Sequence, residues 1–123
     1  MPPPTVLVVE DDPVILRLLE VNFELEGFSV LLAHDGAEGI EMARAEKPGA
    51  IVTDIMMPKT SGLELLAAVR ADDATRAIPV VLLSAKAQTN DLEVGLDAGA
   101  DDYITKPFEP LDLVDRVNAL LAR

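Results

Sequence analysis

The chain has 123 residues, a length that suits one domain, and half of them are hydrophobic. Twenty-two acidic residues against 10 basic ones give a formal net charge of −12, so we expect no direct binding to nucleic acid or to an anionic membrane surface. The sequence has no cysteine, no apolar run long enough to span a bilayer and no signal-peptide pattern at its start, which favours a cytoplasmic location.

Short apolar runs alternate with segments of helical spacing along the whole chain. In chain order the pattern predicts a strand at 5–9, a helix at 13–26, a strand at 28–33, a helix at 36–45, a strand at 50–53, a helix at 62–70, a strand at 78–83, a helix at 91–98, a strand at 103–105 and a helix at 110–121. Pro13 suits the first turn of the first helix, and Gly27 suits the position just past its end.

Five strand–helix units imply parallel strands joined by right-handed crossovers. The strand runs are nearly all apolar, which is typical of a sheet covered by helices on both faces. The sequence therefore predicts an α/β fold, a doubly wound five-stranded parallel sheet of order 2-1-3-4-5 with five helices, as in flavodoxin-like proteins. A closed barrel would need eight such units and about twice the length.

Polar residues follow four of the five predicted strands, at the edge where sheets of this type bind ligands. In chain order they are Glu10, Asp11 and Asp12, then Asp54, then Ser84, then Lys106. Each has an ordinary explanation when taken alone, and for Asp12, directly before Pro13, a helix N-cap is the favoured role. Their joint placement instead indicates a shared site.

The residue types in this set suit phosphoryl chemistry at a metal site. Crowded carboxylates such as Glu10, Asp11 and Asp54 repel one another unless a cation lies between them, and Mg²⁺ (or Mn²⁺) is a hard ion that prefers oxygen ligands. A carboxylate oxygen can accept a phosphoryl group to give an aspartyl phosphate. Lys106 could supply positive charge and Ser84 a hydroxyl donor to the phosphoryl oxygens.

Four motifs resemble the receiver domains of two-component response regulators. They are residues 8–12 (VVEDD), 53–58 (TDIMMP) with Gly62, 83–85 (LSA) and 99–108 (GADDYITKPF). The resemblance extends from the first strand to the last helix, so we expect residues 1–123 to be one receiver domain, with no output domain in this chain.

The resemblance implies roles for the residues around the acidic cluster. Asp54 matches the phosphoacceptor of the family. Glu10 and Asp11 match its acidic pair, Asp11 as a direct metal ligand and Glu10 acting through water. The backbone carbonyl of Met56 matches the third protein ligand to the metal.

Three further matches concern the response to phosphorylation. Ser84 matches the hydroxyl residue that turns toward the phosphoryl group, and Tyr103 the aromatic switch residue that turns inward when Ser84 moves. Lys106 matches the family's lysine, and its peptide bond to Pro107 is expected to be cis.

The implied function is a phosphorylation-activated signalling switch. A sensor histidine kinase, a phosphotransfer protein or a small phosphodonor would supply the phosphoryl group, and the surface of the fourth helix, fifth strand and fifth helix would relay the change to an output domain or effector protein. The chain would catalyse only its own phosphorylation and dephosphorylation, so we do not expect an enzyme.

A homodimer through the fourth helix, fifth strand and fifth helix is a further possibility. Asp101, Asp102, Asp112 and Arg116 lie where receivers of winged-helix transcription factors form charged pairs. Leu92, however, replaces the basic residue usual in those receivers, which counts against that dimer.

Other classes of protein fit the sequence less well. A phosphatase with an aspartate nucleophile usually has a second Asp two residues later, where this chain has Met56. A flavin-binding electron carrier would need a Ser-, Thr- or Gly-rich loop after the first strand, and a degenerate receiver would lack part of the site. Lys86 could tune how fast water reaches an acyl phosphate, although a surface lysine is an equally good description. His34, the single histidine, is best described as a loop residue and gives no support for a phosphohistidine relay. A stand-alone regulator and a part of a larger protein both stay open.

Overall fold

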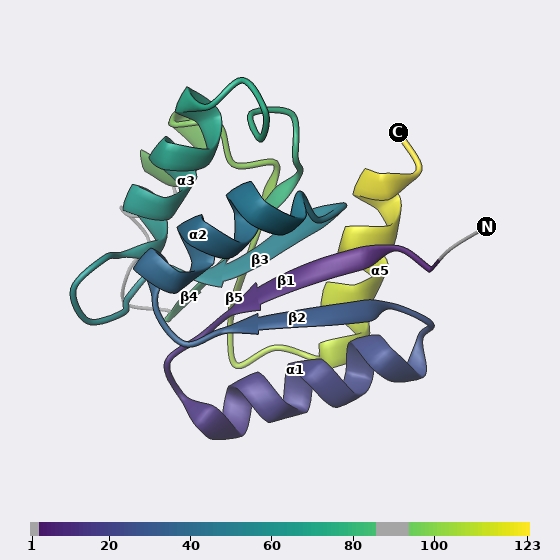
Figure 1. Cartoon of the computed structure of the whole chain (residues 1–123). Helices are drawn as coiled ribbons and strands as arrows, with labels where there is room; N and C mark the ends of the chain where they lie inside the picture. Colours follow the sequence, from purple (N-terminus) through teal and green to yellow (C-terminus); the bar gives the residue numbers. More distant parts are fainter. Residues whose placement is uncertain (1–2, 86–93) are drawn as a thin grey trace.

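The computed structural model describes residues 3–85 and 94–123, and its elements alternate between strand and helix (Figure 1). The strands are β1 (Thr5–Val9), β2 (Ser29–Ala33), β3 (Ala50–Asp54), β4 (Val80–Ala85) and β5 (Asp102–Lys106). The helices are α1 (Pro13–Leu25), α2 (Gly36–Glu46), α3 (Gly62–Ala71) and α5 (Pro110–Leu121). Residues 94–97 are also helical, and residues 91–93 of the helix predicted at 91–98 lie outside the described residues.

The strands form one parallel sheet in the order β2-β1-β3-β4-β5, as predicted. The chain begins in the middle of this sheet at β1, adds β2 on one side and then crosses to β3 on the other side. The strand order therefore reverses between β1 and β3, and their carboxyl ends lie next to each other. This is the position at which open α/β sheets bind ligands.

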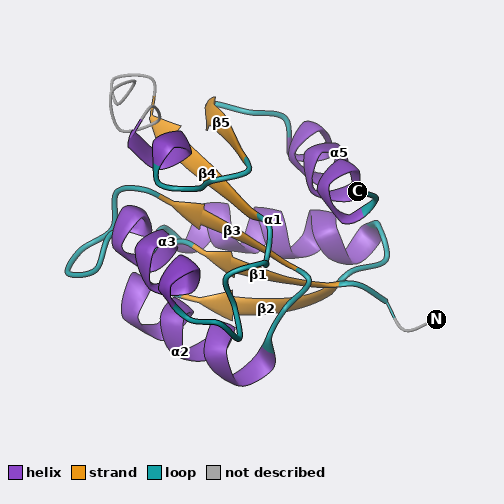
Figure 2. Ribbon diagram, turned by 90° about the horizontal axis from the view of Figure 1, so that it is seen from above, coloured by secondary structure: helices purple, strands orange, loops and turns teal. Residues whose placement is uncertain are grey.

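Helices cover both faces of the sheet, which explains the apolar strands (Figure 2). One core cluster joins the inner sides of α1 and α5 to one face, with Phe23 and Val117 among its fully buried members. The other cluster joins α2 and α3 to the opposite face, with Leu65 among its fully buried members. No helix among the described residues is both long enough and apolar enough to cross a membrane.

Three strands extend further than the sequence pattern predicts. Asp54 is the last residue of β3, Ser84 lies within β4, and Lys106 is the last residue of β5, so the expectation that these residues follow their strands was wrong by one or two positions. Parallel pairing is made by backbone groups, and it continues through Ser84 opposite Thr105 whatever the polarity of the side chains.

Local signals at the chain turns are confirmed. An oxygen of the Asp12 side chain accepts a hydrogen bond from the backbone N–H of Val14 at 2.9 Å, so Asp12 is the N-cap of α1. Gly27 follows the end of α1 with a φ of 91°, a conformation that glycine adopts without steric cost. The peptide bond between Lys106 and Pro107 is cis.

Candidate functional site

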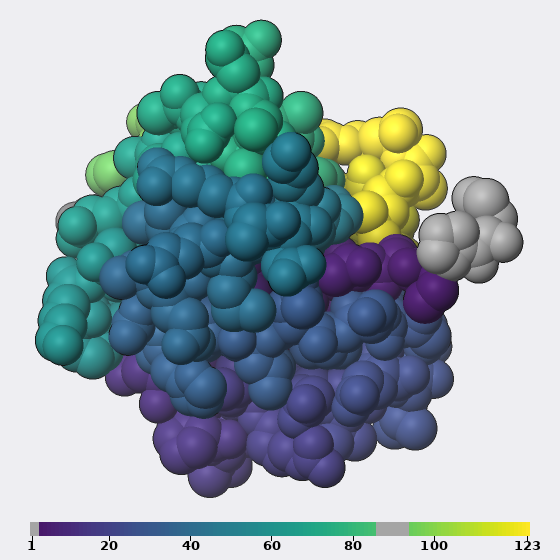
Figure 3. Space-filling model, viewed as in Figure 1, coloured from purple at the N-terminus to yellow at the C-terminus, as the bar shows by residue number. Residues whose placement is uncertain are grey.

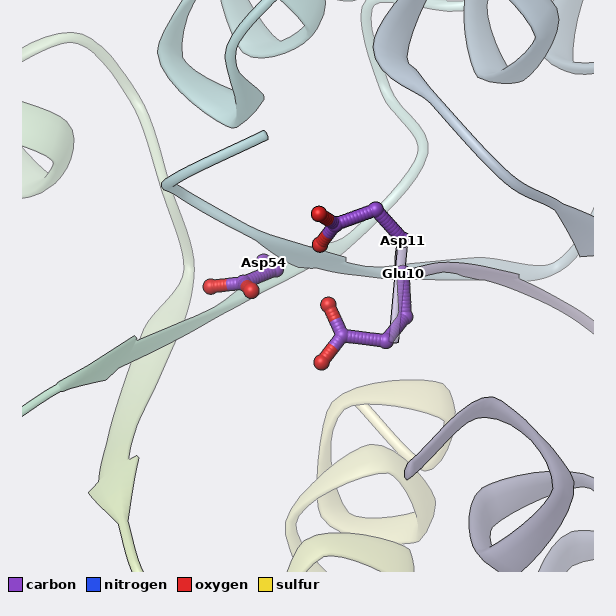
Figure 4. A group of neighbouring side chains, drawn as sticks. All are labelled: Glu10, Asp11 and Asp54. Carbon is purple, nitrogen blue, oxygen red and sulfur yellow. The ribbon is translucent and has the colours of Figure 1, made fainter. Parts of the chain in front are cut away.

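Three carboxylates meet at the carboxyl ends of β1 and β3. Glu10 and Asp11 directly follow β1, and Asp54 ends β3, so the strand reversal places them side by side (Figure 4). One oxygen of each carboxylate lies within 4.8 Å of one oxygen of each of the others. Glu10 and Asp54 are buried, whereas Asp11 is exposed, so the cluster opens to solvent on the side of Asp11.

Lys106 reaches this cluster from β5. Its Nζ donates hydrogen bonds to Oε1 of Glu10 and to Oδ2 of Asp54, each at 2.9 Å. The second oxygen of Glu10, Oε2, is buried and has no hydrogen-bond partner among the residues that the structure describes. A buried carboxylate oxygen without a donor is energetically costly, which indicates that the cluster is incomplete by itself.

Proton affinities in the cluster are shifted by burial and by like charge. The pKa of Glu10 is raised to about 8, chiefly by burial and in addition by the neighbouring Asp54 carboxylate, and Lys106 only partly opposes these effects. Burial lowers the pKa of Lys106, but its hydrogen bonds to Glu10 and Asp54 outweigh that effect and leave the pKa above its ordinary value. Near neutral pH Glu10 therefore keeps a proton that an isolated glutamate would already have released.

A divalent ion fits this donor set. Glu10, Asp11 and Asp54 offer oxygen ligands only, which suits Mg²⁺, and a cation or its bound water would satisfy the orphaned Oε2 of Glu10. Met56 lies two residues past Asp54, in the loop between β3 and α3, and its side chain is 60% exposed. Its side chain therefore does not contribute to the buried cluster.

The two remaining predicted residues lie on β4 and β5. Ser84 is fully buried, one position beyond the residue of β4 that pairs with Asp54, and its Oγ donates to the carbonyl of Ala85 at 3.1 Å. Tyr103 is 37% exposed, and it pairs with Leu82 of β4.

Thr53 begins the 53–58 motif and adjoins the site, and the sequence analysis gave it no role. It is fully buried beside the cluster, and its hydroxyl donates to the backbone carbonyl of Asp54 at 3.0 Å. The only signal in the sequence is a polar residue at the end of an apolar strand run. That signal is too common to identify a residue by itself.

The acidic residues considered for dimer contacts are paired within the chain. Arg116 of α5 contacts Asp102 at 3.2 Å and Asp112 at 3.4 Å, while Asp101 pairs with Arg70 and Arg123. Leu92, considered for the dimer surface, lies outside the described residues. So does Lys86, considered for the phosphorylation site. His34 lies between β2 and α2, where its ring contacts Glu38.

An apolar cavity of about 390 Å³ lies beside Lys106. Its walls are Ile15, Leu18, Lys106, Pro107 and Phe108, so it lies between α1 and the segment that follows β5. The Lys106 side chain thus connects this cavity to the carboxylates.

Comparisons with known proteins agree with the fold and with the character of the site. The sequence model of the response regulator receiver domain family matches residues 6–118. The transcriptional regulatory protein PrrA of Mycobacterium tuberculosis is 48% identical over 120 residues, which cover 98% of this chain and 51% of PrrA. The chain spans about half the length of the curated relatives that it matches, several of which are named as transcriptional regulators.

Two solved structures have the same fold over nearly their whole length. A response regulator of Chloroflexus aurantiacus matches with a TM-score of 0.93 at 36% identity, covering 98% of this chain and 99% of that one. The receiver domain of the sensor histidine kinase PA1611 of Pseudomonas aeruginosa matches with a TM-score of 0.91 at 30% identity and the same coverage, and it holds a magnesium ion in its active-site cleft. The chain belongs to the response regulator receiver domain family of two-component systems.

Proposed function

We propose that residues 1–123 form one receiver domain that accepts a phosphoryl group on Asp54. The donor would be a sensor histidine kinase, a phosphotransfer protein or a small phosphodonor such as acetyl phosphate. The observation that carries this proposal is the buried Asp54 carboxylate, held by Lys106 within a cluster of oxygen ligands. The only other buried carboxylate among the described residues is Glu10, which shares the cluster and Lys106 with Asp54 and to which the family resemblance gives a role in metal binding.

In the proposed reaction, an oxygen of Asp54 forms a bond to phosphorus while the bond from phosphorus to the donor atom breaks. A Mg²⁺ ion held by Asp11, Asp54 and the Met56 carbonyl, with Glu10 acting through water, would neutralise charge on the phosphoryl oxygens. Lys106 already lies 2.9 Å from Asp54, so its ammonium group can follow the phosphoryl oxygens with a small movement. The Ser84 hydroxyl would leave the carbonyl of Ala85 and donate to the phosphoryl group.

The switch would work through Ser84, Tyr103 and α5. Tyr103 is partly exposed, so it can turn inward when Ser84 moves toward the phosphoryl group. Arg116 donates to the backbone carbonyl of Tyr103 at 3.0 Å and to Asp102 at 3.2 Å, so α5 is bonded to the strand that carries this ring. We propose that a movement of Tyr103 alters the surface of the fourth helix, β5 and α5, which is the surface read by an output domain or effector.

The remaining proposals concern the cellular setting. The chain would catalyse only its own phosphorylation and dephosphorylation, act in the cytoplasm and bind neither nucleic acid nor membrane directly. A homodimer through the fourth helix, β5 and α5 would require Arg116 to exchange its contacts with Asp102 and Asp112 for the same groups of a second copy.

Intact mass after incubation with acetyl phosphate tests the phosphoacceptor. We expect the wild type to gain one phosphoryl mass when Mg²⁺ is present and none when it is chelated. Asp54→Ala should gain nothing, whereas Asp102→Ala, which changes an aspartate away from the cluster, should gain the same mass as the wild type.

Two results would contradict the proposal. Phosphorylation of Asp54→Ala at the wild-type level would place the acceptor elsewhere. If neither acetyl phosphate nor a panel of autophosphorylated histidine kinases modifies the wild type with Mg²⁺ present, the chain is not a phosphate-accepting receiver.

A further inference from the structure

Two glycines, Gly62 and Gly36, allow very close backbone contacts with the segment that joins β3 to α3, residues 55–61. A Cβ atom added to Gly62 would lie 2.1 Å from the carbonyl oxygen of Asp54, and the N–H of Gly62 donates to the carbonyl of Ile55 at 2.9 Å. The loop therefore begins and ends at nearly the same place, directly beside the acidic cluster.

The second glycine, Gly36, belongs to a different element. It is the first residue of α2 and is buried, and a Cβ atom there would lie 2.4 Å from the carbonyl oxygen and 2.8 Å from the Cγ2 of Thr60. In Figure 3 the teal atoms of the loop lie at the edge of the molecule beside the blue atoms of α2. The start of α2 thus packs against the end of the loop that contains Thr60.

This end of α2 is itself firmly held. The Asp35 side chain accepts a hydrogen bond from the N–H of Glu38 at 2.8 Å, and the Glu38 side chain accepts one from the N–H of His34 at 2.8 Å. A side chain at position 36 could not be accommodated by unwinding α2 without loss of these bonds. The loop would have to move instead. The atom in the way is the backbone carbonyl oxygen of Thr60, which a change of side-chain rotamer cannot displace.

We propose that Gly36 is a positioning residue for the metal site, acting through Thr60 on the loop that carries the Met56 carbonyl. The inference rests on the proposed function, in which that carbonyl is a metal ligand. Mg²⁺ tolerates only small departures from octahedral geometry, so a backbone ligand on a displaced loop binds it less well. Substitution of residues that orient metal ligands without touching the metal commonly weakens metal affinity by about tenfold or more.

Gly39 provides a matched control on the same helix. The three atoms nearest to a Cβ at Gly39 all belong to side chains outside the loop, Cδ1 of Leu65 at 2.7 Å and the two Cγ atoms of Val9 at 3.0 and 3.2 Å. Gly36→Ala and Gly39→Ala therefore introduce the same methyl group on one face of α2. Only the first substitution pushes against the loop.

Calorimetric titration with Mg²⁺ tests the proposal, with urea unfolding of each variant in EDTA as a separate measure of the fold. We expect Gly36→Ala to bind Mg²⁺ on the order of tenfold more weakly than the wild type, and Gly39→Ala to bind it as tightly as the wild type even if it is less stable. Thr60→Gly removes only the Cγ2 part of the contact, keeps the backbone carbonyl and leaves α2 unchanged. Because it also frees the backbone of the loop, it should weaken Mg²⁺ binding as well. It serves as the test if Gly36→Ala does not fold.

Each contrary outcome has a distinct meaning. Wild-type affinity in folded Gly36→Ala, or in Thr60→Gly if Gly36→Ala does not fold, would overturn the inference and leave the proposed function intact. Equal weakening by Gly36→Ala and Gly39→Ala would also overturn it, because the effect would then follow from helix packing alone. A wild type that binds no Mg²⁺, or binds it as tightly as Asp54→Ala does, would overturn the metal site itself and this inference with it.

Discussion

Both ends of the sheet contain ionic groups with little exposure to solvent, but the hydrogen bonds of these groups are satisfied at one end and incomplete at the other. At the amino end, the Arg70 guanidinium donates to the carbonyls of Gly99, Arg76 and Ile78 and to Asp101, at distances of 2.7 to 3.0 Å. Asp101 also accepts from the N–H of Val80 at 2.9 Å. At the carboxyl end, Lys106 bonds to two carboxylates and Oε2 of Glu10 has no partner among the described residues.

The difference separates a stabilising network from a reactive one. A charge pair whose hydrogen bonds are all made holds elements together, and Arg70 joins α3 to the starts of β4 and β5 in this way. Crowded carboxylates that lack a hydrogen-bond donor destabilise the fold, because they repel one another and are removed from water. Binding of a cation relieves both costs. We therefore expect substitutions at the amino end to change stability and substitutions at the carboxyl end to change ion binding and phosphorylation.

The largest effect on stability is expected from Arg70→Met. Removal of the guanidinium leaves Asp101 and three carbonyls short of a donor, and because both partners are about one-fifth exposed we expect a loss of about 2 kcal/mol in the free energy of unfolding. Urea unfolding measures it, with Arg76→Met as a control that breaks an exposed pair with Asp73. If Arg70→Met loses no more free energy of unfolding than Arg76→Met, the amino end is not the stabilising network described above.

At the carboxyl end, the carboxylate cluster should make the stability of the protein depend on pH. The pKa of Glu10 is raised from 4.5 to about 8 in the folded chain, so the folded state binds this proton more tightly than the unfolded state does. Without divalent ions, the free energy of unfolding should fall as pH rises from 4.5 towards 8 and then level off. Glu10→Gln should show a clearly flatter profile over that range, and identical profiles for the two proteins would contradict the assignment.

Added Mg²⁺ should offset part of that loss. At pH 8 and a concentration ten times its dissociation constant, Mg²⁺ should raise the free energy of unfolding by about 1.4 kcal/mol. Asp11→Asn should abolish most of the gain, while Asp73→Asn, which changes a 92% exposed carboxylate two residues past the end of α3, should keep it. Equal gains in both variants would mean that the ion acts on general charge and not at the cluster.

The smallest effect is expected from Arg123→Ala. Arg123 contacts the same carboxylate as Arg70, at 2.8 Å, but its side chain is 61% exposed. Exposed pairs contribute little, so we expect a loss of at most about 0.5 kcal/mol in urea unfolding. A loss as large as that of Arg70→Met would show that the network depends on all its cations equally.

Most of the fold could be predicted because apolar periodicity and turn residues act locally. The α5 helix has the predicted bounds, and Asp12 and Gly27 mark the ends of α1 as expected. The ends of β3, β4 and β5 could not be placed, because backbone pairing with a neighbouring strand decides where a strand stops. That pairing leaves no mark on the side-chain pattern.

The candidate site could be predicted to the extent that its residues lie at or just after the carboxyl ends of strands. The structure brings Glu10, Asp11 and Asp54 together and adds Lys106, as the strand order requires. The contact of Gly36 with Thr60 and the bond of Arg70 to Asp101 join segments that are distant in sequence. They depend on how helices and loops pack over the sheet, which one sequence does not reveal.

Tyr103 is the only tyrosine of the chain, and the sequence contains no tryptophan. Intrinsic tyrosine fluorescence from the unmodified protein therefore comes from a single ring, the one on β5 that is now partly exposed. Its emission intensity and its quenching by added iodide depend on how much water surrounds the ring. The molecule thus carries its own optical reporter, with which a stopped-flow instrument could test for, and time, the proposed inward turn of Tyr103 after acetyl phosphate is added.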